Sequence, residues 1–139
     1  MKNNKGFTLV ELLATLVVLG IIMAIAVPNV ISVVQKNRQK TLIEDAKKML
    51  SMAQYKVAKE NVTDDKKYTL SELDITEELK KGPNGELYKR DKSRVEFSSG
   101  TYTVYLYEQD HTCIEGLTEE DLYKDTNKTI EELSDSCSN

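Results

Sequence analysis

The chain is poor in the side chains and motifs on which enzymes and metal proteins depend. Its 139 residues include no tryptophan, one histidine, two cysteines, two prolines and six glycines. It has no glycine-rich motif of the kind that cradles phosphates. His111 stands close to Cys113, but a nucleophile and its base usually converge from distant positions, and one His with one Cys is too small a ligand set for a metal. We therefore expect a non-enzymatic protein that holds no cofactor and no metal.

Charge is missing from one long segment near the N-terminus. Residues 7–34 carry a single charged side chain, Glu11, whereas residues 35–139 carry 17 Lys and Arg against 22 Asp and Glu. The second part is long enough for one small folded head but not for two. Its net negative charge argues against nucleic acid as the main ligand, because phosphate contacts need clustered cations.

Three interpretations compete for the apolar segment. A secretory signal peptide would be cut at the small-x-small pattern of residues 24–26, but it would place Glu11 inside a region that should carry no charge. A plain single-pass anchor fits the length, because residues 12–34 make about 35 Å of helix and a hydrocarbon core is about 30 Å thick. A charge inside a span costs about 2.5–3.5 kcal/mol on insertion scales, so the anchor interpretation leaves Glu11 unexplained.

The third interpretation rests on the N-terminal sequence itself. A basic leader, residues 1–6, runs into a stretch that reads KGFTLVELLATLVVLGIIMAIAVPNV from Lys5 onwards. This stretch resembles the N-termini of type IV pilins and of the related pseudopilins of type II secretion. The resemblance covers about residues 2–60, and it is most specific in the first half. The pilin interpretation explains both the junction of Gly6 with Phe7 and the position of Glu11.

The resemblance implies a role for each of these residues. In this family a prepilin peptidase cuts after the glycine that ends the leader, here Gly6, and the new N-terminal residue, here Phe7, is usually N-methylated. The glutamate five residues into the mature chain, here Glu11, meets the N-terminal amine of a neighbouring subunit in the filament. A carboxylate and an ammonium attract strongly in a medium of low dielectric, which is consistent with such a role. Glu11 is therefore expected to serve assembly and not catalysis.

Gly20 and Pro28 are expected to weaken the apolar helix. Proline removes a helix hydrogen bond, and glycine lowers helix propensity by about 1 kcal/mol. In pilins, residues at these positions flank a segment that can unwind when the subunit packs into the filament. Both residue types are also commoner in membrane helices than in soluble ones, so an ordinary structural role stays open.

The helical pattern continues beyond the span. One helix from Phe7 to about Glu60 would be about 80 Å long at 1.5 Å per residue. The cluster of Lys36, Arg38 and Lys40 departs from the rule that cations gather on the cytoplasmic side, and it could contact lipid phosphates or acidic neighbours in a fibre. Apolar side chains recur at three- and four-residue steps over about 35–60 and predict an amphipathic half-helix: Leu42, Ile43, Ala46, Met49, Leu50, Ala53 and Val57.

A small antiparallel sheet is expected over about 86–107. Residues 94–97 and 102–107 alternate in polarity and flank residues 98–100, which is typical of a hairpin, and residues 82–85 give a strong turn signal. Residues 61–67 are expected to form a loop, and residues 68–73 a short strand or a turn of helix. The predicted fold is therefore α+β, with three strands packed on the amphipathic half-helix. The expected inner face of the hairpin consists of Val95, Phe97, Tyr102, Val104 and Leu106.

Two cysteines remain near the C-terminus. An even pair outside the membrane favours a disulfide between Cys113 and Cys137 over catalysis or metal binding, and many pilins close a C-terminal loop in this way. Two free thiols remain the alternative. The enclosed loop, 113–137, contains at residues 116–122 a pattern typical of a capped helix start.

The expected organisation is a prepilin leader over 1–6, a transmembrane and assembly helix over 7–34, and an extracytoplasmic head over 35–139. The resemblance implies a homo-oligomeric filament that includes other pilins, a prepilin peptidase and methyltransferase, and a membrane assembly platform with its ATPase. It places the chain in the bacterial cytoplasmic membrane, with the head outside, and in a surface filament. A secretion or competence pseudopilus and a non-polymerising single-pass surface protein are the alternatives.

Overall fold

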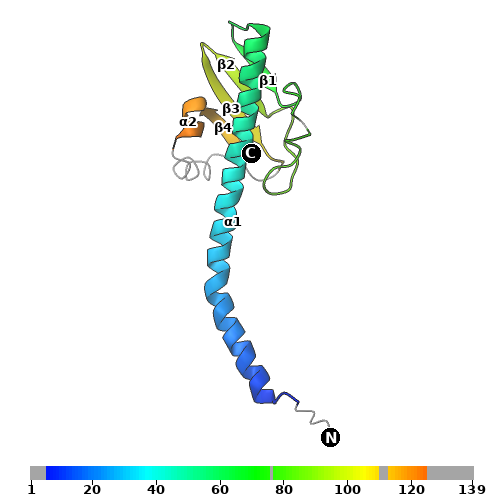
Figure 1. Ribbon diagram of the computed structural model, residues 1–139, viewed down its shortest axis with the longest axis vertical. Coiled ribbons are helices and arrows are strands. Elements are labelled where there is room, and N and C mark those ends of the chain that lie inside the picture. The colour runs from blue at the N-terminus through cyan, green and yellow to red at the C-terminus, as the bar shows by residue number, and fades with distance from the viewer. Residues whose placement is uncertain (1–5, 76, 110–112, 125–139) are drawn as a thin grey trace. The chain divides into compact units, whose positions relative to one another are not determined.

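The computed structural model describes residues 6–75, 77–109 and 113–124. Within these residues the fold is α+β, as expected, and consists of a long N-terminal helix and a small antiparallel sheet (Figure 1). The chain divides into two compact units, one that ends at Gln35 and one that begins at Lys36. The elements in chain order are α1 (Leu9–Glu60), β1 (Lys66–Thr69), β2 (Arg94–Ser98), β3 (Thr101–Tyr107), β4 (Cys113–Thr118) and α2 (Glu119–Tyr123).

The N-terminal unit is helical from Leu9 onwards and has no core of its own. Every described side chain from Gly6 to Gln35 is exposed. Gly20 and Pro28 both lie inside the helix, so the segment between them is wound in this structure. By length and composition, α1 contains a stretch that could cross a membrane. A helix that is apolar on all sides needs surroundings that the single chain does not supply.

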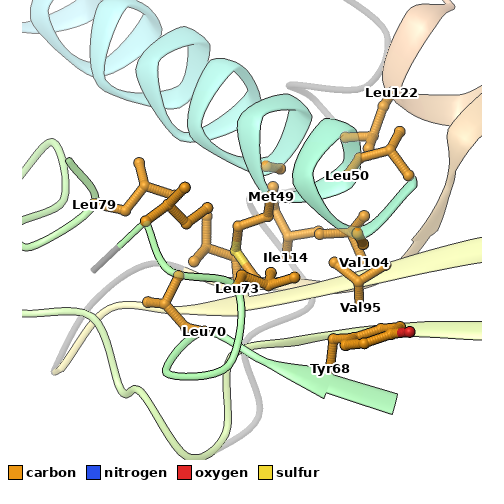
Figure 2. Packing of buried hydrophobic residues seen from close by; sticks show 14 of the residues in the cluster. Met49, Leu50, Tyr68, Leu70, Leu73, Leu79, Val95, Val104, Ile114 and Leu122 are labelled. Atoms are coloured by element: carbon orange, nitrogen blue, oxygen red, sulfur yellow. The ribbon is translucent and has the colours of Figure 1, made fainter. Parts of the chain in front are cut away.

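The second unit, the head, has its core between the second half of α1 and the sheet. The amphipathic stripe predicted for this half-helix is confirmed, because each of its apolar residues is buried. In Figure 2, Met49 and Leu50 of α1 lie against the strand residues Val95, Val104 and Ile114. The buried stripe consists of Leu42, Ile43, Ala46, Met49, Leu50, Ala53 and Val57.

The sheet has the order β1-β2-β3-β4, and all neighbouring strands are antiparallel. The predicted hairpin is confirmed: β2 and β3 are joined by Ser99 and Gly100, with φ angles of 49° and 81°. Positive φ at both central residues is the geometry that matches the twist of two antiparallel strands. On the inner face, Val104 pairs with Val95, and both are fully buried, as is Leu106.

The sheet is larger than the expected range of 86–107, because β1 and β4 extend it at both edges. β1 lies partly in the stretch 61–67 that was expected to be a loop, and only one of its side chains, that of Tyr68, is buried. β4 forms the start of the expected C-terminal loop. Its Gly116, with φ of 72°, lies at a register shift opposite Val104 and Tyr105, where an extra residue must be accommodated.

Residues 86–89, which were expected to open the sheet, form only isolated bridges in the structure. Leu87 pairs with Lys81, and Tyr88 pairs with Glu108 at the end of β3. The turn over residues 82–85 is confirmed, because the Gly85 amide donates a hydrogen bond of 2.9 Å to the Gly82 carbonyl.

The connection from β1 to β2, residues 70–93, closes one side of the core with five buried hydrophobic side chains in its described part. It ends where the Leu70 amide donates a hydrogen bond of 2.8 Å to the carbonyl of Ser93. On the other side, the predicted helix start near residues 116–122 is confirmed as α2, in which Thr118 and Asp121 form a capping box and Leu122 is buried. The buried hydrophobic residues of the connection are Leu70, Leu73, Ile75, Leu79 and Tyr88. Leu70, Leu73 and Leu79 are labelled in Figure 2.

Candidate functional site

Glu11 and Thr8 together cap the first turn of α1. The Thr8 amide donates to Glu11 Oε2 at 2.8 Å, and the Glu11 amide donates to Thr8 Oγ1 at 3.3 Å. The Thr8 hydroxyl also donates to Glu11 Oε2 at 3.1 Å. This reciprocal arrangement is a capping box, which satisfies amides that have no partner inside the helix. Sequence analysis singled out Glu11 but missed Thr8, although the pattern T-x-x-E at residues 8–11 was there to find it.

The capping box gives the Glu11 carboxylate favourable surroundings in a single chain. Its Oε2 atom accepts from Thr8, and the N-terminal end of a helix favours a negative charge. Within the part of the chain that the structure describes, Oε1 accepts no hydrogen bond. The carboxylate is therefore held in place by one oxygen and keeps acceptor capacity on the other.

A shallow concavity of about 560 Å³ lies beside this carboxylate. Its walls are mostly apolar, and Glu11 supplies the one charge. Such a place suits a group that combines an apolar body with a cation, because the body covers apolar surface while the cation neutralises the carboxylate. The lining residues are Phe7, Glu11, Leu12, Ala14 and Thr15.

The other polar side chains of the apolar segment are satisfied by the helix that carries them. The Thr15 hydroxyl donates to the Leu12 carbonyl at 2.8 Å, and the Asn29 amide group donates to the Ile25 carbonyl at 3.1 Å, next to Pro28. Such back-bonding removes most of the cost of a polar group in a membrane, where no water is available. Among residues 7–34, Glu11 is the only one with a charged side chain.

Neither Gly6 nor Gly20 is required by packing inside the chain. A Cβ atom at either position would meet no atom within 4 Å, and neither glycine has a positive φ. Unwinding between Gly20 and Pro28 stays a prediction, because this stretch is helical here. A glycine that the chain's own structure does not need is free to serve recognition by another molecule.

Residues 1–27 match the prokaryotic N-terminal methylation motif. The chain carries the signature of type IV pilins and pseudopilins. The motif implies processing by a prepilin peptidase. Together with the apolar helix it supports membrane anchoring. No curated protein and no solved structure matches the chain.

The buried carboxylates of the head serve its structure. Asp45, which is 6% exposed, accepts a hydrogen bond of 2.8 Å from the Tyr88 hydroxyl. It also forms an ion pair of 3.0 Å with Lys48. Burial and the Asp45 carboxylate raise the pKa of Tyr88, so this phenol stays protonated and remains a donor. These contacts tie the loop before β2 to α1.

Glu108, which is 3% exposed, holds the turn over residues 82–85. It accepts from the Asn84 amide at 2.9 Å and from Asn84 Nδ2 at 2.7 Å. A Cβ at Gly82 would lie 2.6 Å from Glu108 Oε1, so the turn needs a glycine there. The residues that the structure describes contain no cluster of three potential metal ligands.

The predicted disulfide is not tested by the structure. Cys113 begins β4, whereas Cys137 lies outside the described residues, as does His111. The pairing of Cys113 with Cys137 therefore stays a prediction, and so does the closed loop over 113–137.

Proposed function

We propose that this chain is the precursor of a structural subunit in a type IV pilus-like filament. Its leader would be removed after Gly6, Phe7 would be methylated, residues 7–34 would hold it in the membrane, and the same helix would pack in the filament. The observation that carries the proposal is the position of Glu11, capped at the start of an exposed apolar helix inside the methylation motif.

The geometry around Glu11 suits this assembly role. The N-terminal residue of a processed neighbour would be Phe7, which combines an apolar ring with an ammonium group. Glu11 Oε1 and the apolar concavity beside it match those two features. Because an unpartnered charge is costly in low dielectric, bringing the amine of one copy to the carboxylate of another would favour docking and fix the axial register.

The chemical steps would belong to partners. A prepilin peptidase and methyltransferase would process the chain, and a membrane assembly platform with its ATPase would extract it from the bilayer. The homo-oligomer would be a helical filament that admits other pilins, located at the cytoplasmic membrane and on the cell surface. The head, with its hairpin, favours a pilus for adhesion, motility or surface interaction.

Two alternatives remain next to this proposal. The same N-terminus occurs in pseudopilins of secretion and competence machines, whose filament stays within the cell envelope. A single-pass surface protein that never polymerises is the alternative of another class. In that case removal of the Glu11 charge would leave surface display and extraction behaviour unchanged.

The deciding experiment is mass spectrometry of the protein in the fraction sheared from intact cells. Abundant chain that begins at methylated Phe7 would support a pilus subunit. The same processed chain found only in membranes would favour a pseudopilus. A chain that begins at Met1 or at Val27 would overturn the proposal.

A further inference from the structure

Three cations lie on opposite sides of α1 where the apolar segment ends. Lys36, Arg38 and Lys40 follow the last apolar residue of the segment, Val34, and precede Leu42, where the core of the head begins. All three side chains are exposed. In the described part of the chain none of them forms an ion pair, in contrast to Lys47 and Lys48 about two turns further along. We call these three residues the cationic collar.

We propose that the cationic collar binds the phosphates of anionic phospholipids in the outer leaflet. The proposal rests on the proposed function, which places residues 7–34 across the membrane. Residues 12–34 make about 35 Å of helix, which fills a hydrocarbon core of about 30 Å. The collar starts two residues later and is about 6 Å long, close to the thickness of one headgroup layer. Its long side chains extend the reach of the charges along the helix.

The arrangement of the collar around the helix favours lipid over a protein neighbour. Successive residues of an α-helix are 100° apart, so Lys36 and Lys40 share one side while Arg38 points to the other. A protein surface touches a helix from one side and would leave part of the collar unpaired. Headgroups surround a membrane helix and can pair with cations on every side of it.

The negative charge of the rest of the head also favours a cationic segment at the membrane surface. Residues 44–139 contain 14 Lys and Arg against 22 Asp and Glu, and residues 108–139 alone contain 2 against 10. Such a head is repelled by an anionic membrane surface, and this repulsion acts within a Debye length of about 8 Å at physiological salt. Cations placed at the surface offset the repulsion where it is strongest.

The test measures which lipids surround the collar. Because the chain has no tryptophan, the substitution Gln35→Trp places a single tryptophan next to the collar, which can be excited at wavelengths where the seven tyrosines do not absorb, and indole rings favour the membrane interface. The full-length protein is reconstituted in vesicles that contain brominated phosphatidylglycerol or brominated phosphatidylcholine as the quencher. The relative quenching gives the ratio of the two lipids' binding constants at the helix.

The proposal predicts an approximately fivefold preference for phosphatidylglycerol at low salt, the factor expected for one cation at an anionic surface. Replacing Lys36, Arg38 and Lys40 with glutamine in the reporter chain should reduce the ratio to about one. The matched control replaces the exposed cations Lys89, Arg90 and Lys92 with glutamine, which removes the same charge from the head and should leave the preference intact.

Three results would overturn the proposal. Equal binding of both lipids by the unaltered collar, or a preference that survives its replacement, would assign the collar to another occupant such as an acidic surface of a second copy. The absence of quenching by either lipid would instead show that the reporter lies outside the bilayer. That result would overturn the membrane anchoring in the proposed function and the collar with it.

Discussion

The two units of this chain differ in where their apolar surface lies. Eighteen large hydrophobic side chains are exposed before residue 35, against three in the described part of the head, and the head buries eighteen hydrophobic residues of its own. The N-terminal unit owes its helix to local hydrogen bonds and capping, and the head owes its fold to a core. A surface as apolar as the first unit's is stable only in lipid or against other protein.

The largest expected effect is on leader cleavage, and it separates recognition of Gly6 by the peptidase from folding of the head. Gly6→Val should abolish leader cleavage, because the site would lose its glycine, while the fold of the head stays intact, since a side chain at this position meets no atom within 4 Å. The intact mass of the protein from cells reports the retained leader. Gly20→Ala is the control, and it should be cleaved normally. Normal processing of Gly6→Val would contradict the assigned cleavage site.

The second prediction separates the charge of Glu11 from its role as a helix cap. Glu11→Gln keeps a capping side chain but removes the charge, and it should reduce filament in the sheared fraction at least about tenfold, since one partner of a desolvated charge pair is lost. Thr8→Val removes the hydroxyl contacts of the box, while the backbone amide of residue 8 and the Glu11 carboxylate remain, and it should have a smaller effect. If both variants lose filament equally, capping and not charge is the role of Glu11.

The third prediction concerns the core of the head. Leu50→Ala should reduce the free energy of unfolding by about 2–5 kcal/mol, because it opens a cavity at a fully buried position. All seven tyrosines lie in the head and the chain has no tryptophan, so near-ultraviolet circular dichroism during denaturation in detergent follows the head alone. Leu19→Ala, at an exposed position of the first unit, is the control and should leave the transition unchanged.

The fourth prediction tests the buried hydrogen bond between Tyr88 and Asp45. Tyr88→Phe should destabilise the head by about 1–3 kcal/mol, because the Asp45 carboxylate loses a donor where water cannot replace it. Tyr105→Phe, on the outer face of the sheet, is the matched control with an expected effect near zero. The same denaturation assay measures both. Equal stabilities of the two variants would contradict a structural role for the bond.

The smallest expected effect is a pH dependence confined to the head. The Thr69 amide and hydroxyl lower the pKa of Glu72, and the Thr118 hydroxyl lowers the pKa of Asp121. Since these carboxyls bind protons less readily when folded, their stabilisation is present at neutral pH and is lost as the pH falls through their lowered folded pKa values, below about pH 4. Thermal unfolding from pH 6 to pH 3 should show a modest decline. Glu72→Gln should flatten part of it, and an unchanged slope would exclude Glu72 as a cause.

Some elements of the head could be predicted because local sequence alone specifies them. The stripe from Leu42 to Val57 follows helical periodicity, and Ser99-Gly100 joins two alternating segments. For β1 the sequence indicated a strand only as one of two possibilities for residues 68–73, and it placed β4 in a loop. β1 has two lysines and a single buried side chain, and it is a strand because Tyr68 pairs with Val95. β4 carries Gly116, which weakens a strand pattern, although here it occupies a register shift.

The sequence by itself determined the character of the N-terminal unit, since the methylation motif over residues 1–27 and the charge at Glu11 are local patterns that act through chemistry within a few residues. Only the tertiary structure decided which residues enter the sheet and why Asp45 and Glu108 are buried. Their partners, Tyr88 and Asn84, lie 43 and 24 residues away along the chain. Pairings of that kind depend on how the whole core closes, and no local pattern encodes them.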